Sequence, residues 1–441
     1  MAKSSFDMSL VKELMHKTQE EINKMPPVNV MLVGKTGVGK STLVNSIFRE
    51  NLSQTGIGKP VTQHLVKIAK DGVPISLYDT RGLELEKSIQ HQVKKEVLDT
   101  IKKNKGKEDQ IHVVYYCLNA ASNRIEASEI DFIKELGKEV PVIVVLTQSI
   151  GTPAEEFRKY IYQLNLGIVG VVNIMAQPYP IYESVTIPSS GLVELIDLTF
   201  TVVPKEVSEA LTNVQQVDIA RKAKQARKWA THYIATTFGI GFSPIPFSDA
   251  TLLVPMQVTM MAHITAIFGM AVDKNTMTTI VSVVGGTSGA TFLGRYITSN
   301  LLKLIPGVGS IAGGIISGTT ASIVTTALGM SYVEVLTILA KSQQEGGTVS
   351  MDQLKELMKT KIEQRLKQGK QNPDIQRIRA QQGITKELQN DSPIKAEIIE
   401  NEKQKTNPIK IGVRQTKKLT QQVQGWLQKS MKLGTKDKKA K

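Results

Sequence analysis

A glycine-rich stretch near the N-terminus has the spacing of a phosphate-binding loop. The letters GKTGVGKST fit Gly-x-x-x-x-Gly-Lys-Ser and directly follow the apolar run VNVMLVG. In such a loop the backbone N–H groups turn inward around phosphates, Lys40 reaches the terminal phosphates and the Ser41 hydroxyl binds Mg²⁺. A helix starting near residue 40 adds a favourable dipole. The predicted phosphate-binding residues here are Gly34, Lys35, Thr36, Gly37, Val38, Gly39, Lys40, Ser41 and Thr42.

Two further segments are spaced to complete a site for Mg²⁺ and a γ-phosphate. SLYDTRGLE ends an apolar run with Asp79, and Gly82 follows in an Asp-x-x-Gly pattern. The Asp79 carboxylate can hold the Mg²⁺ shell, and the Gly82 N–H can contact the γ-phosphate. Upstream, Thr62 can bind Mg²⁺ when the terminal phosphate is present, so that its loop would order only then. Thr55 is the alternative, and Thr62 is preferred because it directly precedes a predicted strand. The predicted metal ligands are Ser41, Thr62 and Asp79.

This order of motifs resembles the GTPase superfamily, particularly its Era-like and Toc-like members, over roughly residues 28–200. The resemblance implies that the phosphate and Mg²⁺ contacts are made by Lys40, Ser41, Thr62, Asp79 and Gly82. Leu83 follows where Ras-like enzymes have a water-positioning glutamine, and Era-like proteins commonly have a hydrophobic residue there too. Slow hydrolysis is therefore expected, assisted by dimerisation, a partner or a bound cation, and no catalytic residue is assigned.

The segment expected to recognise the base departs from the family pattern. Where relatives have Asn/Thr-Lys-x-Asp, this chain has TQSI from Thr147 to Ile150, and the next acids are Glu155 and Glu156. The lysine that packs on the base and the aspartate that accepts the guanine N1 and N2 hydrogens are both missing. A neutral Gln148 can still stack and hydrogen-bond, but selectivity should suffer. We expect Thr147 and Gln148 to bind the base of a purine nucleotide, GTP by kinship, with ATP as the alternative.

The elements around these motifs alternate between strand and helix patterns. Strands are predicted at 28–34, 64–70, 74–80, 111–119, 141–147 and 170–176, and helices at 40–50, 86–104, 126–137, 154–165 and 190–200. Such alternation predicts an α/β P-loop NTPase fold, with a mostly parallel sheet covered by helices on both faces. We assign residues 28–205 to this G domain. Residues 1–27 hold an N-terminal amphipathic helix, predicted at 8–24 and stopped by the prolines that follow.

Residues 229–333 are different in kind, because they contain only five charged side chains. The uncharged windows are 229–248, 250–272, 275–294 and 304–333. A span of about 20 apolar residues can cross a bilayer as a helix. The windows are also rich in Gly, Ser and Thr, and Gly-x-x-x-Gly spacings let helices pack closely in lipid or in a soluble bundle. Both a buried helical core and membrane embedding stay open.

Within this region, SPIPFSDATLLVPMQVTMMAHITAIFG resembles the YcjF-like domain of unknown function, which is fused to Era-like GTPases in bacteria. The resemblance implies an all-α, apolar, Gly-rich and membrane-associated domain, which we place at 206–340. Asp249 is expected to cap a helix, with Ser248 as the alternative cap. Gln257 and His263 are expected to satisfy one another in a helical core.

The last part of the chain, residues 341–441, carries most of the positive charge. It holds 23 Lys and Arg against 11 Asp and Glu, a net +12 of the whole chain's +15. This basic Lys/Gln-rich tail suggests an anionic partner such as a lipid surface or nucleic acid, and a solvated, partly disordered tail is the alternative. Helices are predicted near 350–368 and 414–433. The second is basic and amphipathic, as suits an anionic membrane interface or a partner groove.

These features favour a GTP-binding switch and slow GTPase at the cytoplasmic face of a bacterial inner membrane. The single cysteine excludes an internal disulfide and favours a reducing compartment, and no signal peptide is visible. Relatives imply a homodimer paired through the G domains. A ribosome- or RNA-associated GTPase is less favoured, because the tail has one aromatic residue, Trp426. A nucleotide-bound scaffold with little hydrolysis is the third alternative.

Overall fold

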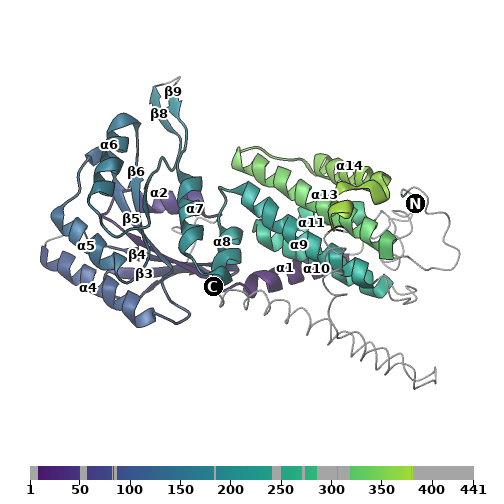
Figure 1. Cartoon of the computed structure of the whole chain (residues 1–441), viewed down its shortest axis with the longest axis horizontal. Helices are drawn as coiled ribbons and strands as arrows, with labels where there is room; N and C mark the ends of the chain where they lie inside the picture. The colour runs from purple at the N-terminus through teal and green to yellow at the C-terminus, as the bar shows by residue number, and fades with distance from the viewer. Residues whose placement is uncertain are drawn as a thin grey trace, which may run out of the picture. The chain divides into compact units, whose positions relative to one another are not determined.

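The chain is represented by a computed structural model, drawn whole in Figure 1. It describes residues 8–49, 57–81, 83, 87–182, 185–240, 250–270, 274–285, 305, 318–378 and 380. The helix α1 (Met8–Asn23) comes first along the chain, an α/β part follows it, and the other helices of a helical part come last (Figure 1). Gly82, Thr55, Ser248, Asp249 and the predicted helix at 414–433 lie outside the described residues.

A seven-stranded sheet forms the centre of the α/β part, in the order β2-β3-β4-β1-β5-β6-β7. Its strands are β1 (Val28–Val33), β2 (Ile57–Pro60), β3 (Leu65–Lys70), β4 (Val73–Thr80), β5 (Val113–Asn119), β6 (Val142–Thr147) and β7 (Gly170–Asn173). β1 pairs in parallel with β4 and β5, β5 with β6 and β6 with β7, whereas β2, β3 and β4 pair antiparallel. The predicted mostly parallel sheet is confirmed. β1, β5 and β6 are almost wholly buried apolar runs, as parallel strands covered on both faces are.

Helices cover both faces of this sheet, as predicted. They are α2 (Lys40–Ile47), α4 (Lys87–Asn104), α5 (Ala127–Gly137), α6 (Gly151–Gln163), α7 (Leu192–Val202) and α8 (Ser208–Val214). Val93, Phe132 and Phe157 of α4, α5 and α6 pack in one apolar cluster with Met31 of β1. α2, α7 and α8 bury side chains in the opposite cluster with Val30. A hairpin of β8 (Tyr179–Tyr182) and β9 (Val185–Ile187) follows β7, and the short 3-10 helices η1 (Ala120–Ser122) and η2 (Lys205–Val207) follow β5 and α7.

The helical part is a bundle with one apolar core. Its helices are α1 (Met8–Asn23), α9 (Ile219–Ile240), α10 (Ala250–Phe268), α11 (Lys274–Gly285), α13 (Gly318–Gln344) and α14 (Met351–Gln368), with the 3-10 helix η3 (Gly369–Gln371) after them. Each contributes buried side chains to the core, represented in chain order by Leu14, Ala230, Ile264, Ile280, Leu336 and Ile362. The N-terminal helix and the helix predicted at 350–368 therefore join the same core as the helices α9, α10, α11 and α13.

One described helical segment, Thr320–Gln344, is long and apolar enough to cross a membrane by length and composition. Of its most apolar stretch, 78% is buried inside the protein, as it would be in the core helix of a soluble bundle. Length and apolarity thus do not separate a core helix from a membrane helix here.

The expected pairing of Gln257 with His263 is wrong. Gln257 donates to Thr325 Oγ1 at 3.2 Å across the bundle. The His263 ring stacks on Trp229, with 4.0 Å between ring centroids, and its Nδ1 lies 3.8 Å from Glu21 Oε2. Both polar side chains have partners on other helices. Because these partners are distant in the sequence, the local pattern of residues does not predict them.

Residues 213–218, here called the junction, connect α8 to α9 and contact both parts of the chain. Gln216 bonds to the last turn of α2: its N–H donates to Ile47 O at 2.8 Å, and its side chain donates to Asn45 O and Ser46 O at 3.0 and 3.2 Å. These carbonyls are left without helical partners where a helix ends. The end of α2 is therefore capped by the segment that leads into the bundle.

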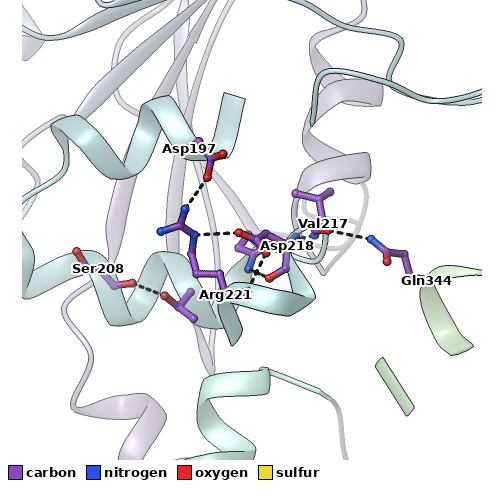
Figure 2. Close-up of polar contacts among 8 residues, drawn as sticks. Asp197, Ser208, Val217, Asp218, Arg221 and Gln344 are labelled. Atoms are coloured by element: carbon purple, nitrogen blue, oxygen red, sulfur yellow. Dashed lines mark hydrogen bonds and ion pairs between the residues drawn. The ribbon is translucent and has the colours of Figure 1, made fainter. Parts of the chain in front are cut away.

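The junction is also hydrogen-bonded to helices of the bundle. Figure 2 shows Arg221 of α9 bonded to both Asp197 and Asp218, and Gln344 of α13 reaching Val217. The buried Lys222 donates from Nζ to Asn213 O and Phe268 O at 2.8 and 2.6 Å. Burial lowers the pKa of this amine well below its ordinary value.

Candidate nucleotide-binding site

The loop between β1 and α2 is folded for close approach of its backbone to a ligand. Gly37 and Gly39 have φ of 80° and 94°, and Gly39 immediately precedes α2. A Cβ at Gly34 would lie 2.6 Å from Cys117 O, which no side chain tolerates. Glycine is the residue that takes these backbone conformations without strain. The predicted loop is thus present at the N-terminus of a helix.

Lys40, the first residue of α2, folds back over this loop. Its Nζ donates to Gly34 O at 2.7 Å and to Lys35 O at 3.2 Å. It also lies 4.0 Å from Asp79 Oδ1, at the end of β4. The structure therefore brings together Lys40 and Asp79, which lie 39 positions apart in the sequence.

Asp79 has the features of a metal ligand. Its Oδ1 is buried and accepts no hydrogen bond from the described residues. Burial raises the pKa of this carboxyl, against the opposing charges of Lys40 and Arg81. A carboxylate oxygen without a hydrogen-bond donor is a natural ligand for Mg²⁺. Asp79, together with Ser41 at the exposed start of α2, fits that ion.

Thr62 is held by another partner. Its hydroxyl donates to Glu96 Oε2 of α4 at 2.5 Å, and the His64 N–H donates to the same oxygen at 3.2 Å. Burial works to raise the pKa of Glu96, but the hydrogen bonds from Thr62, Gln92 and His64 outweigh it and lower the pKa. Glu96 thus holds the segment before β3 against α4. The role of Thr62 as a metal ligand stays a prediction.

Lys35 offers only its backbone to the loop, because its side chain turns away. Its Nζ lies 2.6 Å from Glu126 Oε1 and 3.6 Å from Glu129 Oε1, at the start of α5. Glu129 in turn accepts from the Glu126 N–H at 2.9 Å, which caps α5. Sequence reasoning missed both acids and Glu96, since nothing local links them to the loop.

At the predicted base segment, the Thr147 side chain is buried and points to the phosphate loop. Its hydroxyl donates to Val38 O at 2.5 Å and to Leu118 O at 3.1 Å. Thr147 therefore ties together the phosphate loop and the ends of β5 and β6. Gln148 is exposed and has a φ of 54°, which is rare for a residue with a side chain. Direct contact of either residue with a base stays a prediction.

Comparison with known proteins bears on this site. Residues 29–148 match the family described as 50S ribosome-binding GTPase. This stretch includes the phosphate loop, Asp79 and the base segment as far as Gln148. The chain carries an N-terminal P-loop GTPase domain.

The GTPase domain also has relatives among curated proteins. Rat (Rattus norvegicus) septin-9 is 26% identical over 155 residues, which cover 29% of this chain and 27% of septin-9. Zebrafish (Danio rerio) neuronal-specific septin-3 is 25% identical over 154 residues, covering 29% of this chain and 43% of the relative. The match thus spans less than half the length of these relatives.

Two solved structures are similar to part of this chain. A probable GTP-binding protein, engB, is 16% identical with a TM-score of 0.28, covering 41% of this chain and 99% of that one. A dimerisation-deficient mutant of Toc33 from Arabidopsis thaliana is 18% identical with a TM-score of 0.27, covering 48% and 96%.

In this GTPase domain, Leu83 cannot position a water molecule. Its side chain is 6% exposed and packs in the cluster that contains Val93 and Val97 of α4. A buried aliphatic side chain has no hydrogen-bonding group for a nucleophile. Any group that orients water in this domain must therefore come from elsewhere.

Proposed function

We propose that the protein is a GTP-binding switch and a slow GTPase, working at the cytoplasmic surface of a membrane. The observation that carries the proposal is the buried Asp79 Oδ1, which accepts no hydrogen bond from the part of the chain that the structure describes and lies 4.0 Å from the Lys40 ammonium. This pair fits a triphosphate with Mg²⁺: the ion would supply charge stabilisation, while Lys40 binds the phosphates and Asp79 holds the ion's shell.

The link from nucleotide to the rest of the chain runs through α2 and the junction. α2 begins at the phosphate loop and is only eight residues long. Its far end is bonded to Gln216, and the junction is bonded to α9, α10 and α13 through Lys222, Ala266 and Gln344. A shift of α2 on nucleotide binding would therefore reach the bundle over one short, rigid element.

The membrane part of the proposal rests on charge. Residues 341–441 carry a net +12, which an anionic lipid surface attracts at about 1 kcal/mol per basic residue close to it. Binding to vesicles that contain phosphatidylserine, but not to neutral vesicles, with release at high salt, is the expected result of a flotation assay. Equal binding to both vesicle types would contradict an electrostatic surface contact. Pairing of two copies through their GTPase domains belongs to the same proposal.

The decisive test is GTP binding and turnover by the full chain with Mg²⁺, with Lys40→Ala as the blank. We expect the variant to bind GTP roughly 10–100-fold more weakly, since a hydrogen bond to a charged group is worth about 1.5–3 kcal/mol. Equal GTP binding by the wild type and by Lys40→Ala would contradict the proposal. Tight binding with no turnover would leave a nucleotide-bound scaffold in place of a GTPase.

A ribosome-associated role is the second candidate, because the family that residues 29–148 match is described as ribosome-binding. Co-sedimentation with 50S subunits, compared between GTP and GDP, tests it directly. Nucleotide-dependent pelleting that persists in the presence of anionic vesicles would favour this candidate over the membrane surface.

A further inference from the structure

The base segment presents few groups to a ligand. The Thr147 hydroxyl points inward, as described above, and the Ser149 hydroxyl donates to Leu146 O at 2.7 Å. Gln148 and Ile150 are the exposed side chains, and that of Ile150 is 41% exposed. Ile150 stands at the position where the family pattern has a carboxylate. The base would therefore meet an amide and an aliphatic group.

The amide of Gln148 accepts a hydrogen bond from Asn119, at the end of the neighbouring strand β5. Asn119 Nδ2 donates to Gln148 Oε1 at 3.3 Å. Asn119 is itself fixed, because its Oδ1 accepts from the Ala121 N–H at 2.8 Å. The oxygen end of the Gln148 amide is thus engaged, and the NH₂ end is left to donate.

The substituent at position 6 of a purine determines whether the base can accept a hydrogen bond from the Gln148 NH₂ group. Guanine and hypoxanthine carry an acceptor, O6, at position 6, whereas adenine carries an amino group there. A fixed NH₂ group complements O6 and opposes the adenine amino group. Discrimination of this kind is strong where a site is built to hydrogen-bond one partner.

The position where the family has its carboxylate holds no acid, because Ile150 stands there; Glu156, the exposed acid on α6, comes six positions later. Glu155 Oε2 accepts from Asn173 Nδ2 at 3.0 Å, and Glu126 is bonded to Lys35. Ile150 cannot accept a hydrogen bond. An amino group placed against it gains nothing and loses a water partner. Position 2 of the purine is therefore not recognised.

We infer that Asn119 and Gln148 form a 6-oxopurine site that recognises O6 and ignores position 2, so that guanine and hypoxanthine nucleotides bind alike and adenine nucleotides bind weakly. This inference rests on the proposed function, since the phosphate loop must hold the triphosphate. Asn119 is a positioning residue and Gln148 is the residue that contacts the base.

The test is displacement of a fluorescent GTP analogue from the full chain with Mg²⁺ by GTP, ITP, ATP and tripolyphosphate. ITP should compete within about threefold of GTP, and ATP about tenfold or more weakly. GTP binding more than about tenfold tighter than ITP would mean that the 2-amino group is recognised, and would overturn the inference. Equal competition by GTP and ATP would overturn it too.

Single substitutions distinguish the positioning role of Asn119 from the base contact of Gln148. Asn119→Ala frees the Gln148 amide to rotate and present its oxygen to adenine, so the GTP/ATP ratio should fall to within about threefold. An unchanged ratio would overturn the positioning role. Gln148→Ala should weaken GTP and ITP equally, while Gln163→Ala, an exposed glutamine on α6, should change nothing. Weakening of GTP alone would contradict the assigned contact.

Tripolyphosphate distinguishes failure of this inference from failure of the proposed function. Unchanged competition by tripolyphosphate in both variants shows that the phosphate loop is intact. Competition by tripolyphosphate without any base preference overturns the inference alone. If neither the probe nor tripolyphosphate binds, the proposed function falls and the inference falls with it.

Discussion

At the scale of single residues, Thr147 gives the most direct test of the site's architecture. Its hydroxyl is the donor to both Val38 O and Leu118 O. Thr147→Val keeps the shape but removes the donor, at an expected cost of about 1–3 kcal/mol in the free energy of unfolding. Urea denaturation measures it. Thr152→Val, at an exposed position on α6, is the matched control and should cost nothing measurable.

The site residues that the sequence predicts are those whose chemistry lies in a short motif. Lys40, Ser41 and Asp79 each follow a recognisable strand or loop, and the structure gathers Lys40 with Asp79. Glu96 and Glu126 went unseen because their partners, Thr62 and Lys35, are 34 and 91 positions away. A long-range ion pair has no local spacing, so its members look like ordinary surface acids.

At the scale of elements, Gln216 tests the cap on α2. Gln216→Ala removes the side-chain donor to Asn45 O and Ser46 O, and we expect a loss of about 1–3 kcal/mol in stability. Hydrogen exchange should also quicken at the amides of the last turn of α2, such as Phe48, which donates to Val44 O. Gln344→Ala, which removes another side-chain contact to the junction, should leave that turn protected. Unchanged exchange in Gln216→Ala would show that the cap does not hold the helix.

Lys222 makes the packing of α9 against α10 depend on pH. Its folded pKa lies well below the ordinary 10.5. Between those two values the unfolded chain binds a proton that the folded chain does not, so stability rises with pH by up to about 1.4 kcal/mol per pH unit. Below the folded pKa this gain is absent. The wild type should therefore gain stability over Lys222→Met as pH rises through this window, in paired urea titrations. Lys224→Met, at an exposed position, should track the wild type, and parallel profiles for wild type and Lys222→Met would contradict the argument.

Elements with strong periodicity or long apolar runs were predictable, and short ones were not. The helix at Met351–Gln368 and the strands β1, β5 and β6 agree with prediction to within two residues. β2, with four residues including Gly58 and Pro60, carries no apolar alternation. The β8–β9 hairpin has strands of four and three residues, which are too short to show an alternation of apolar and polar residues. Such strands form because a neighbouring strand offers hydrogen bonds.

At the scale of the whole molecule, the N-terminal helix packs in the core of the helical bundle that follows the GTPase domain. A short stretch of sequence does not predict such a long-range contact. α1 precedes the GTPase domain, yet Val11 and Leu14 lie in the bundle core beside residues of α10 and α13. Ile22 and Met25, at its end, pack with Ala210 of α8 and Ala266 of α10. α8 also contributes Leu211 to the core beneath the sheet. The two parts therefore share an element, and we expect them to unfold together.

That expectation can be measured with one tryptophan. Trp229 lies in the bundle, and Trp426→Phe removes the only other tryptophan. If unfolding is cooperative, GTP at a hundred times its dissociation constant should stabilise the Trp229 transition by about 2.7 kcal/mol, although the nucleotide binds in the other part. Lys40→Ala should abolish the shift. If GTP does not stabilise the Trp229 unfolding transition in the wild type, the bundle unfolds independently of the GTPase domain. In that case α2 and the junction do not couple nucleotide binding to the bundle.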